Sequence, residues 1–279
     1  MKTMKTKILV SSDSGIDYMS HPHSISSLPS LIKFFDIEKY FDYIDMTSEK
    51  FYNRLKYDIK AKPEIVPMDI EYIENDINVA LESYDNVLII VSTYLEYGAI
   101  FGQLREDYGD KVDFYITNAT GYILSMMAIE CDKALKDNKS IDDAKKVMDG
   151  IFYNSCMLIV NPAIDINISE NIDEDKRVEE KRKAKMYVVD AYNEVEIKDK
   201  DRDFIVSIIK HYLDRVAEDT VMPFIMYSSK YSYYYNLLES KLLIIHKRYK
   251  SIKKIPVSPD LGLKYGKNII VIGYIKNLN

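Results

Sequence analysis

Hydroxyl and carboxylate side chains gather directly after the first apolar run of the chain. The run ILV is followed by Ser11, Ser12, Asp13, Ser14 and Gly15. Open α/β sheets bind ligands at the carboxyl ends of their strands, where such side chains can donate and accept hydrogen bonds. Neither G-x-G-x-x-G nor G-x-x-x-x-G-K-[ST] is present, so a nucleotide-binding loop is not indicated. We predict a ligand crevice at Ser12, Asp13 and Ser14; the alternative is an ordinary turn whose side chains bond to the local backbone.

A second pair of hydroxyls, Ser92 and Thr93, follows the continuous apolar run NVLIIV. This run is typical of a strand covered on both faces, which would place both hydroxyls at the same carboxyl edge as the first group. There they can donate to a ligand oxygen, or they can cap the following helix. The sequence leaves both interpretations open.

Catalytic and metal-binding side chains do not form a recognisable constellation. The four histidines are His21, His23, His211 and His246. No G-x-S-x-G nucleophile elbow accompanies them, and each is more typical of a solvated or core histidine than of a catalytic one. Cys131 and Cys156 lie in separate apolar contexts, which indicates neither a disulfide framework nor a metal knuckle. We therefore predict no catalytic residue, no cofactor and no metal.

Composition limits the class of protein and of partner. The chain has 279 residues, of which 47% are hydrophobic and 29% charged, so it can bury real cores. Its net charge of -6 disfavours a nucleic-acid partner. The apolar run near the start spans only four residues, and nowhere do 18 apolar residues run together. We expect a soluble, cytoplasmic protein without a transmembrane segment.

The elements that must position these groups follow an α/β pattern with a boundary near residue 150. In residues 1–150, short apolar runs alternate with amphipathic ones, which predicts a sheet with crossover helices. The predicted strands there are 8–11, 87–91 and 112–117, and the predicted helices are 47–59, 70–81, 99–108, 121–135 and one capped by Ser140. In residues 151–279, strands predominate, which predicts a mixed sheet. The predicted strands there are 156–160, 186–197, 221–227, 242–248 and 268–275, and the predicted helices begin at Asp201 and Tyr231. A run of mixed charge over residues 170–185 predicts a solvated helix or connection.

Six segments, taken in order, resemble the DegV family of bacterial proteins, which bind a fatty acid. The segments are ILVSSDSGID, DYIDMTSEKFYNRLK, PEIVPMDIEY, NVLIIVSTYL, SIDDAKKVMDGI and IIVIGYI. The resemblance covers nearly the whole chain. It implies a three-layer α/β/α parallel-sheet domain over residues 1–150, a smaller mixed-sheet α/β domain over residues 151–279, and a ligand crevice between them. It also implies a non-enzymatic protein that holds the acyl chain of a long-chain fatty acid there, for presentation to a separate fatty acid kinase.

The chain departs from the family pattern at three ligand-binding positions. Glu64 stands where a head-group threonine is usual, Asn171 where an arginine is usual and Asp260 where a histidine is usual. Ser92 and Thr93 keep the two hydroxyls of their segment. The implied head-group site has therefore lost its cation and gained up to two carboxylates. Two like charges about 4 Å apart repel by roughly 4 kcal/mol at an effective dielectric of 20, or about three decades of affinity.

Three arrangements escape this repulsion, and the sequence does not choose among them. Burial can protonate Glu64 or Asp260, either carboxylate can point away, or the ligand can be neutral or cationic. The alternative function is that of a diverged paralogue that does not bind a fatty acid and acts through protein contacts. A weaker alternative is an enzyme related by fold to dihydroxyacetone kinases, which the absence of a phosphate-cradling loop disfavours.

Overall fold

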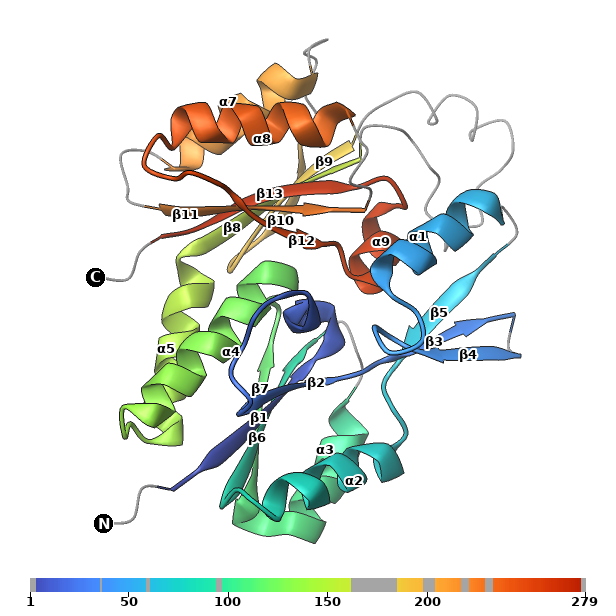
Figure 1. Cartoon of the computed structure of the whole chain (residues 1–279), viewed down its shortest axis with the longest axis vertical. Helices are drawn as coiled ribbons and strands as arrows, with labels where there is room; N and C mark the ends of the chain where they lie inside the picture. Colours follow the sequence, from blue (N-terminus) through green and yellow to red (C-terminus); the bar gives the residue numbers. More distant parts are fainter. Residues whose placement is uncertain are drawn as a thin grey trace. The chain divides into compact units, whose positions relative to one another are not determined.

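The computed structural model describes residues 4–35, 37–58, 61–93, 97–161, 185–197, 204–216, 221–228 and 233–276 (Figure 1). Their contacts divide the chain into two compact units. The first unit comprises Met1–Thr47 and Pro63–Gly150, and the second comprises Ser48–Lys62 and Ile151–Asn279. The predicted division places residues 1–150 in one domain. The contacts instead group Ser48–Lys62 with the second half of the chain.

The first unit is built on a four-stranded parallel sheet. Its strand order is β2 (Ile25–Leu28), β1 (Thr6–Ser11), β6 (Asn86–Ser92) and β7 (Val112–Thr117). Figure 1 shows α2 (Ile70–Leu81) and α3 (Gly98–Tyr108) on one face of this sheet, and α4 (Gly121–Lys136) and α5 (Ile141–Tyr153) on the other. Leu9 and Ile89 of the sheet share a buried core with Ile73 and Leu104 of the first helix pair. The predicted parallel α/β sheet is confirmed.

Local capping explains where α5 begins. Ser140 Oγ accepts a hydrogen bond from the backbone N of Asp143 at 3.1 Å and donates one to Asp143 Oδ2 at 2.8 Å. This arrangement satisfies an N–H group that a helix start leaves without an intrahelical partner, as the sequence predicts. Asp69 occupies the N-cap position of α2, but its side chain makes no capping hydrogen bond there.

A separate three-stranded antiparallel sheet belongs to the first unit. Its order is β4 (Glu38–Phe41), β3 (Leu31–Phe34) and β5 (Pro63–Val66). Two short 3-10 turns, η1 (Ser12–Ser14) and η2 (Ile16–Tyr18), follow β1. The sequence does not predict the three strands, because each has only four residues and shows neither a continuous apolar run nor a long alternation.

The second unit is built on a six-stranded mixed sheet. Its order is β10 (Glu194–Ile197), β9 (Lys185–Asp190), β8 (Ser155–Asn161), β13 (Ile270–Lys276), β11 (Val221–Tyr227) and β12 (Lys253–Pro256). Only the β11–β12 pair is parallel among the described strand pairs of this sheet. Helices α7 (Phe204–Val216) and α8 (Tyr233–Ile245) contribute to one buried core with it. The predicted mixed sheet is confirmed.

The predicted strand over residues 242–248 is wrong. Helix α8 continues through Leu242 to Ile245. Leu238 and Leu242 are fully buried and four residues apart, while Ile244 is exposed, which is the pattern of one buried helix face. The run LLII is apolar throughout, so its periodicity does not separate a helix from a strand. Of the predicted charge run at 170–185, only Lys185 lies within the described residues, and the predicted helix start at Asp201 lies outside them.

None of the helices in the described ranges is long and apolar enough to cross a membrane.

Close packing joins two short helices of the second unit, α1 (Ser48–Tyr57) and α9 (Pro259–Tyr265). The Tyr52 hydroxyl donates a hydrogen bond to the backbone O of Ser258 at 2.9 Å. A Cβ atom added at Gly262 would lie 2.3 Å from this hydroxyl oxygen and 2.7 Å from ring carbon Cε1. Glycine at position 262 therefore allows the tyrosine ring to pack directly on α9.

We expect Gly262→Ala to destabilise the protein by about 1–3 kcal/mol, because the added methyl overlaps the Tyr52 ring. Urea denaturation measures the change in the free energy of unfolding. In a Tyr52→Leu background the ring is absent, so the same glycine substitution should cost much less. An equal cost in both backgrounds would show that the ring contact does not determine the effect.

Candidate ligand-binding site

Four of the predicted site residues come together at the carboxyl end of the parallel sheet. Ser12, Asp13 and Ser14 form η1 directly after β1, and Ser92 ends β6. All four are buried. Ser11 links the two strands, since its Oγ donates to Asp13 Oδ1 and accepts from the backbone N of Ser92. The structure therefore brings these four side chains together at one sheet edge, and their role as a ligand site stays a prediction.

Hydrogen bonds within the first unit hold this cluster in place. Thr120, the N-cap residue of α4, directs its Oγ1 to the backbone O of Asp13 at 3.5 Å. Ser125 Oγ donates to the backbone O of Ser14 at 2.8 Å. Ser14 Oγ in turn accepts from the backbone N of Ile16 at 3.2 Å. Ser14 thus bonds to the local backbone, as expected for an ordinary turn. A role for Ser12, Asp13 and Ser14 in ligand binding stays a prediction.

The Asp13 carboxyl is fully buried within this cluster. Burial raises its pKa to about 6, although nearby hydroxyls of Ser11, Thr120 and Ser92 act in the opposite direction. Its Oδ2 makes no hydrogen bond within the described residues. The site can therefore exchange a proton at Asp13 not far below neutral pH.

A second buried carboxyl, Asp42, lies beside this cluster and was not among the predicted site residues. It follows β4 and is 3% exposed. Its pKa is raised to about 7, mainly by burial and to a smaller extent by the charges of Asp13 and Asp17, while a hydrogen bond from Ser12 acts in the opposite direction. The sequence does not show that Asp42 lies near Ser12 and Asp13, because about 30 residues separate them along the chain. Their proximity depends on the fold of the three-stranded sheet.

Thr93 does not share the buried position of Ser92. It is exposed, its backbone N donates to the backbone O of Thr117 at 2.8 Å, and its Oγ1 donates to Asn118 Oδ1. Tyr97 occupies the N-cap position of α3. The alternative in which Ser92 and Thr93 cap that helix is therefore wrong, and their role as ligand contacts stays a prediction.

The three residues that depart from the family pattern are not brought together in one unit. Glu64 is exposed on β5 of the first unit, directly opposite Lys33 of β3 in the antiparallel register. An opposite charge at this cross-strand position stabilises such a pair of strands. Asp260 lies half-buried in the first turn of α9, in the second unit. Asn171 lies outside the described residues.

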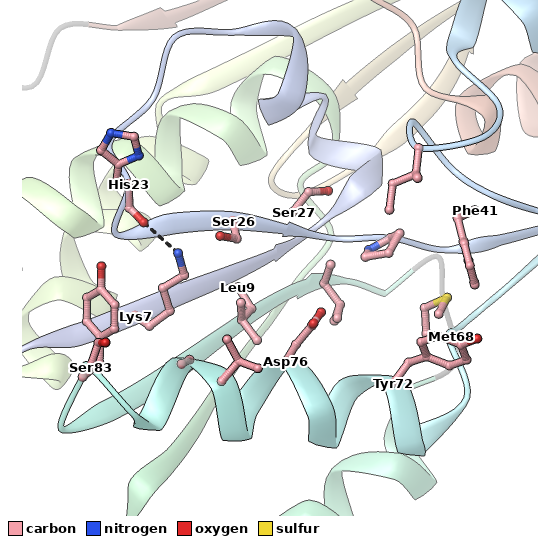
Figure 2. Close-up of a pocket in the computed structure, with 16 residues that line it drawn as sticks. Lys7, Leu9, His23, Ser26, Ser27, Phe41, Met68, Tyr72, Asp76 and Ser83 are labelled. Atoms are coloured by element: carbon pink, nitrogen blue, oxygen red, sulfur yellow. Dashed lines mark hydrogen bonds between the residues drawn. The ribbon is translucent and has the colours of Figure 1, made fainter.

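A cavity of about 580 Å³ lies within the first unit, between the β1–β2 side of the parallel sheet and α2 (Figure 2). Its walls are largely apolar. They include Leu9, Leu28, Phe41, Met68, Tyr72 and Ala80. Ligand pockets for small molecules typically have this size and apolar character. The cavity was not predicted from the sequence. Leu9, Tyr72 and Ala80 lie on predicted elements, but the walls formed by Leu28, Phe41 and Met68 come from short strands and a loop that the pattern does not predict.

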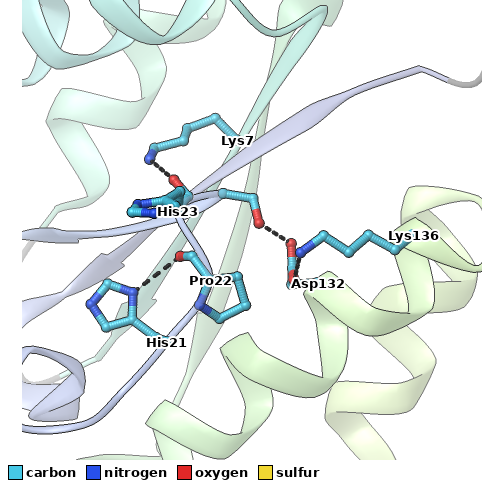
Figure 3. Close-up of polar contacts among 7 residues, drawn as sticks. Lys7, His21, Pro22, His23, Asp132 and Lys136 are labelled. Carbon is cyan, nitrogen blue, oxygen red and sulfur yellow. Dashed lines mark hydrogen bonds and ion pairs between the residues drawn. The ribbon is translucent and has the colours of Figure 1, made fainter.

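Two charged side chains face this cavity, Lys7 from β1 and Asp76 from α2. Burial lowers the pKa of Lys7 and raises that of Asp76, while each charge partly offsets the shift of the other. The Lys7 ammonium donates to the backbone O of His23 at 2.7 Å, as Figure 3 shows. In the sequence, Lys7 stands out only as a charged residue at the start of the apolar strand β1.

The loop that carries His23 is anchored from the other side of the sheet. Ser24 Oγ donates to Asp132 Oδ1 on α4, and Lys136 pairs with Asp132 Oδ2 at 2.6 Å (Figure 3). The Asp132 side chain is 3% exposed in this pair. These bonds fix the position of the carbonyl group that Lys7 contacts.

The structure therefore defines an α/β protein with a parallel-sheet unit, a mixed-sheet unit and an apolar cavity in the first of them. A model of the DegV family, described as an uncharacterised protein family, matches residues 5–165. The chain belongs to the DegV family, and the resemblance noted in its sequence is confirmed. No curated protein matches the sequence.

Solved structures of DegV proteins have the same fold. A DegV family protein from Thermus thermophilus, described by its fatty acid binding, is 11% identical, with a TM-score of 0.76 over 98% of this chain and 100% of that chain. A stearic acid-binding protein from Eubacterium ventriosum is 16% identical, with a TM-score of 0.71 over 97% of this chain and 98% of that chain. DegV of Bacillus subtilis, described as a fatty acid binding protein, is 15% identical, with a TM-score of 0.72 over 98% and 100%.

Proposed function

We propose that this protein binds a long-chain fatty acid in the cytoplasm by burying its acyl chain, and that it acts by binding rather than by catalysis. Membership of the DegV family supports the proposal, as do the fatty acids that relatives of the same fold are described as binding. We further propose that the bound acid is presented to a separate fatty acid kinase.

The observation that carries the proposal is the apolar cavity of about 580 Å³ in the first unit. Each methylene group buried against such walls contributes about 0.8 kcal/mol, so ten buried methylenes would contribute about 8 kcal/mol. This contribution to the binding free energy comes from contact between the acyl chain and the apolar side chains of the cavity, and it does not require contacts to the carboxylate head group. The loss of the family's usual head-group residues at Glu64, Asn171 and Asp260 is therefore compatible with binding of the tail.

Native mass spectrometry of protein purified from a bacterial host tests the proposal. We expect a mass that exceeds that of the chain by one long-chain fatty acid, which disappears when the same sample is denatured. Protein refolded without lipid should regain that mass when palmitate or oleate is added. A clean apo mass in repeated preparations, together with no uptake of either acid, would contradict fatty acid binding and favour the paralogue that acts through protein contacts.

A further inference from the structure

Hydroxyl groups from three parts of the first unit surround the Asp13 carboxyl. Burial raises the pKa of this group, and the hydroxyls of Ser11, Thr120 and Ser92 lower it. Ser11 and Ser92 stand at the carboxyl ends of β1 and β6, and Thr120 precedes α4. Asp13 is 0% exposed, and its Oδ2 makes no hydrogen bond within the described residues. The carboxyl thus has a buried oxygen that no described group satisfies, and such an atom is most costly when the carboxyl is ionised.

The charged neighbours of Asp13 in the described residues are acidic. Asp42 follows β4, and burial raises its pKa, to which the charges of Asp13 and Asp17 add a smaller contribution. Burial also raises the pKa of Asp17 in η2, while the charge of His21 lowers it. In the described part of the chain, no lysine or arginine is among the groups that shift the pKa of Asp13 or Asp42. Several carboxyls therefore share this region, and each added negative charge is repelled.

A ligand anion at this edge of the parallel sheet meets the same repulsion. Open α/β sheets bind ligands at the carboxyl ends of their strands, where Ser11 and Ser92 lie. An ionised Asp13 repels a carboxylate there and competes with it for the Ser92 hydroxyl. A proton on Asp13 removes both obstacles, because a neutral carboxyl repels no anion and has an O–H group to donate. This arrangement couples anion binding to proton uptake.

Resting on the proposed function, we propose that the fatty acid anion binds at this sheet edge together with one proton, which comes from the solvent and is held by Asp13 Oδ2. The protein then neutralises one of its own buried carboxyls instead of pairing the ligand with a cation. Such a site needs no basic side chain. Glu64, Asn171 and Asp260 supply none at the positions where the sequence departs from the family pattern.

Proton uptake makes the affinity for the anion depend on pH. Burial raises the pKa of Asp13 to about 6 in the protein without ligand, and a bound anion raises it further. Above about pH 6 the complex therefore holds a proton that the unliganded protein has lost. The affinity for palmitate should fall as the pH rises through this range, by up to about tenfold per pH unit. Methyl palmitate carries no charge, so its affinity should stay nearly constant.

Asp13→Asn tests this residue, because asparagine has nearly the shape of the neutral carboxyl and cannot ionise. We expect delipidated Asp13→Asn to bind palmitate at least about tenfold more tightly than the unmodified protein at pH 8, and within about twofold of it at pH 6. A purely structural role predicts weaker binding at both pH values. The matched control is Asp110→Asn, which removes an exposed carboxylate and should leave the pH profile unchanged. Thermal melting of each variant establishes that it is folded.

Calorimetric titration at pH 7 in phosphate and in Tris counts the protons, because the two buffers differ in the heat that they absorb on releasing one. Palmitate can hold a proton itself, whereas hexadecane sulfonate stays anionic and isolates the uptake by the protein. We expect about one proton per bound sulfonate with the unmodified protein, and much less with Asp13→Asn. Methyl palmitate should bind without proton uptake.

The outcomes separate this inference from the proposed function. Binding of the sulfonate without proton uptake, or undiminished uptake in Asp13→Asn, overturns the inference while fatty acid binding stands. Weaker palmitate binding by folded Asp13→Asn at both pH values overturns it as well. The proton count on the unmodified protein needs no substitution, so it decides the question even where Asp13→Asn does not fold. No binding of palmitate, sulfonate or ester to the unmodified protein overturns the proposed function itself.

Discussion

Gly273→Ala is expected to destabilise the protein by about 3 kcal/mol or more. Gly273 lies in β13, with Phe224 of β11 and Met157 of β8 as its partners in the two neighbouring strands. A Cβ atom added here would lie 2.2 Å from Cζ of Phe224 and 2.7 Å from the backbone O of Cys156. The ring can rotate only within a fully packed core, and the carbonyl oxygen belongs to the sheet itself. Overpacking of such a site costs about 1–3 kcal/mol and sometimes more.

Urea denaturation followed by circular dichroism measures this loss. The matched control is Gly102→Ala in α3, where an added Cβ would meet nothing within 4 Å. Alanine favours a helix over glycine by about 1 kcal/mol, so this control should be neutral or slightly more stable. Phe224→Leu should recover part of the loss in the Gly273→Ala background, because it removes the closer of the two contacts. Equal unfolding midpoints for the two glycine variants would refute the prediction.

Long apolar runs made much of the fold predictable from the sequence. The run NVLIIV became β6, which is buried along its whole length, and the polar residues after it could be placed at a sheet edge. The three-stranded sheet could not be predicted in this way. Its segments LIKF, EKYF and PEIV have four residues each and are partly exposed, so their pairing depends on contacts distant in sequence.

The same distinction applies to the candidate site. Ser12, Asp13, Ser14 and Ser92 could be predicted because they directly follow strands that the pattern identifies. The cavity residues Lys7 and Asp76 are about 70 positions apart and face each other only after α2 packs on the sheet. Local periodicity carries no information about such a pair. Sequence therefore indicated which sheet edge is polar but not which groups line the apolar cavity.

Asp42→Asn is expected to make the protein more stable at pH 8 and to leave it nearly unchanged at pH 4. Burial, with a smaller contribution from the charges of Asp13 and Asp17, raises the pKa of Asp42 to about 7. In the unfolded chain an aspartate titrates near pH 3.9. Between about pH 4 and pH 7 the folded protein therefore retains a proton that the unfolded chain has lost. Stability falls as the pH rises through this window, because the folded state binds more protons than the unfolded state.

The size of the effect follows from the separation of the two pKa values. Each pKa unit corresponds to about 1.4 kcal/mol, so the penalty for ionising Asp42 amounts to a few kcal/mol above pH 7. An asparagine at this position cannot ionise and avoids the penalty. Urea denaturation at pH 5 and pH 8 should show a smaller loss of stability with rising pH for Asp42→Asn than for the unmodified protein. Asp110→Asn, which removes an exposed carboxylate in η3 (Gly109–Lys111), serves as the control and should leave the pH dependence unchanged. The same pH dependence in both variants would mean that Asp42 is charged in the folded protein at little cost.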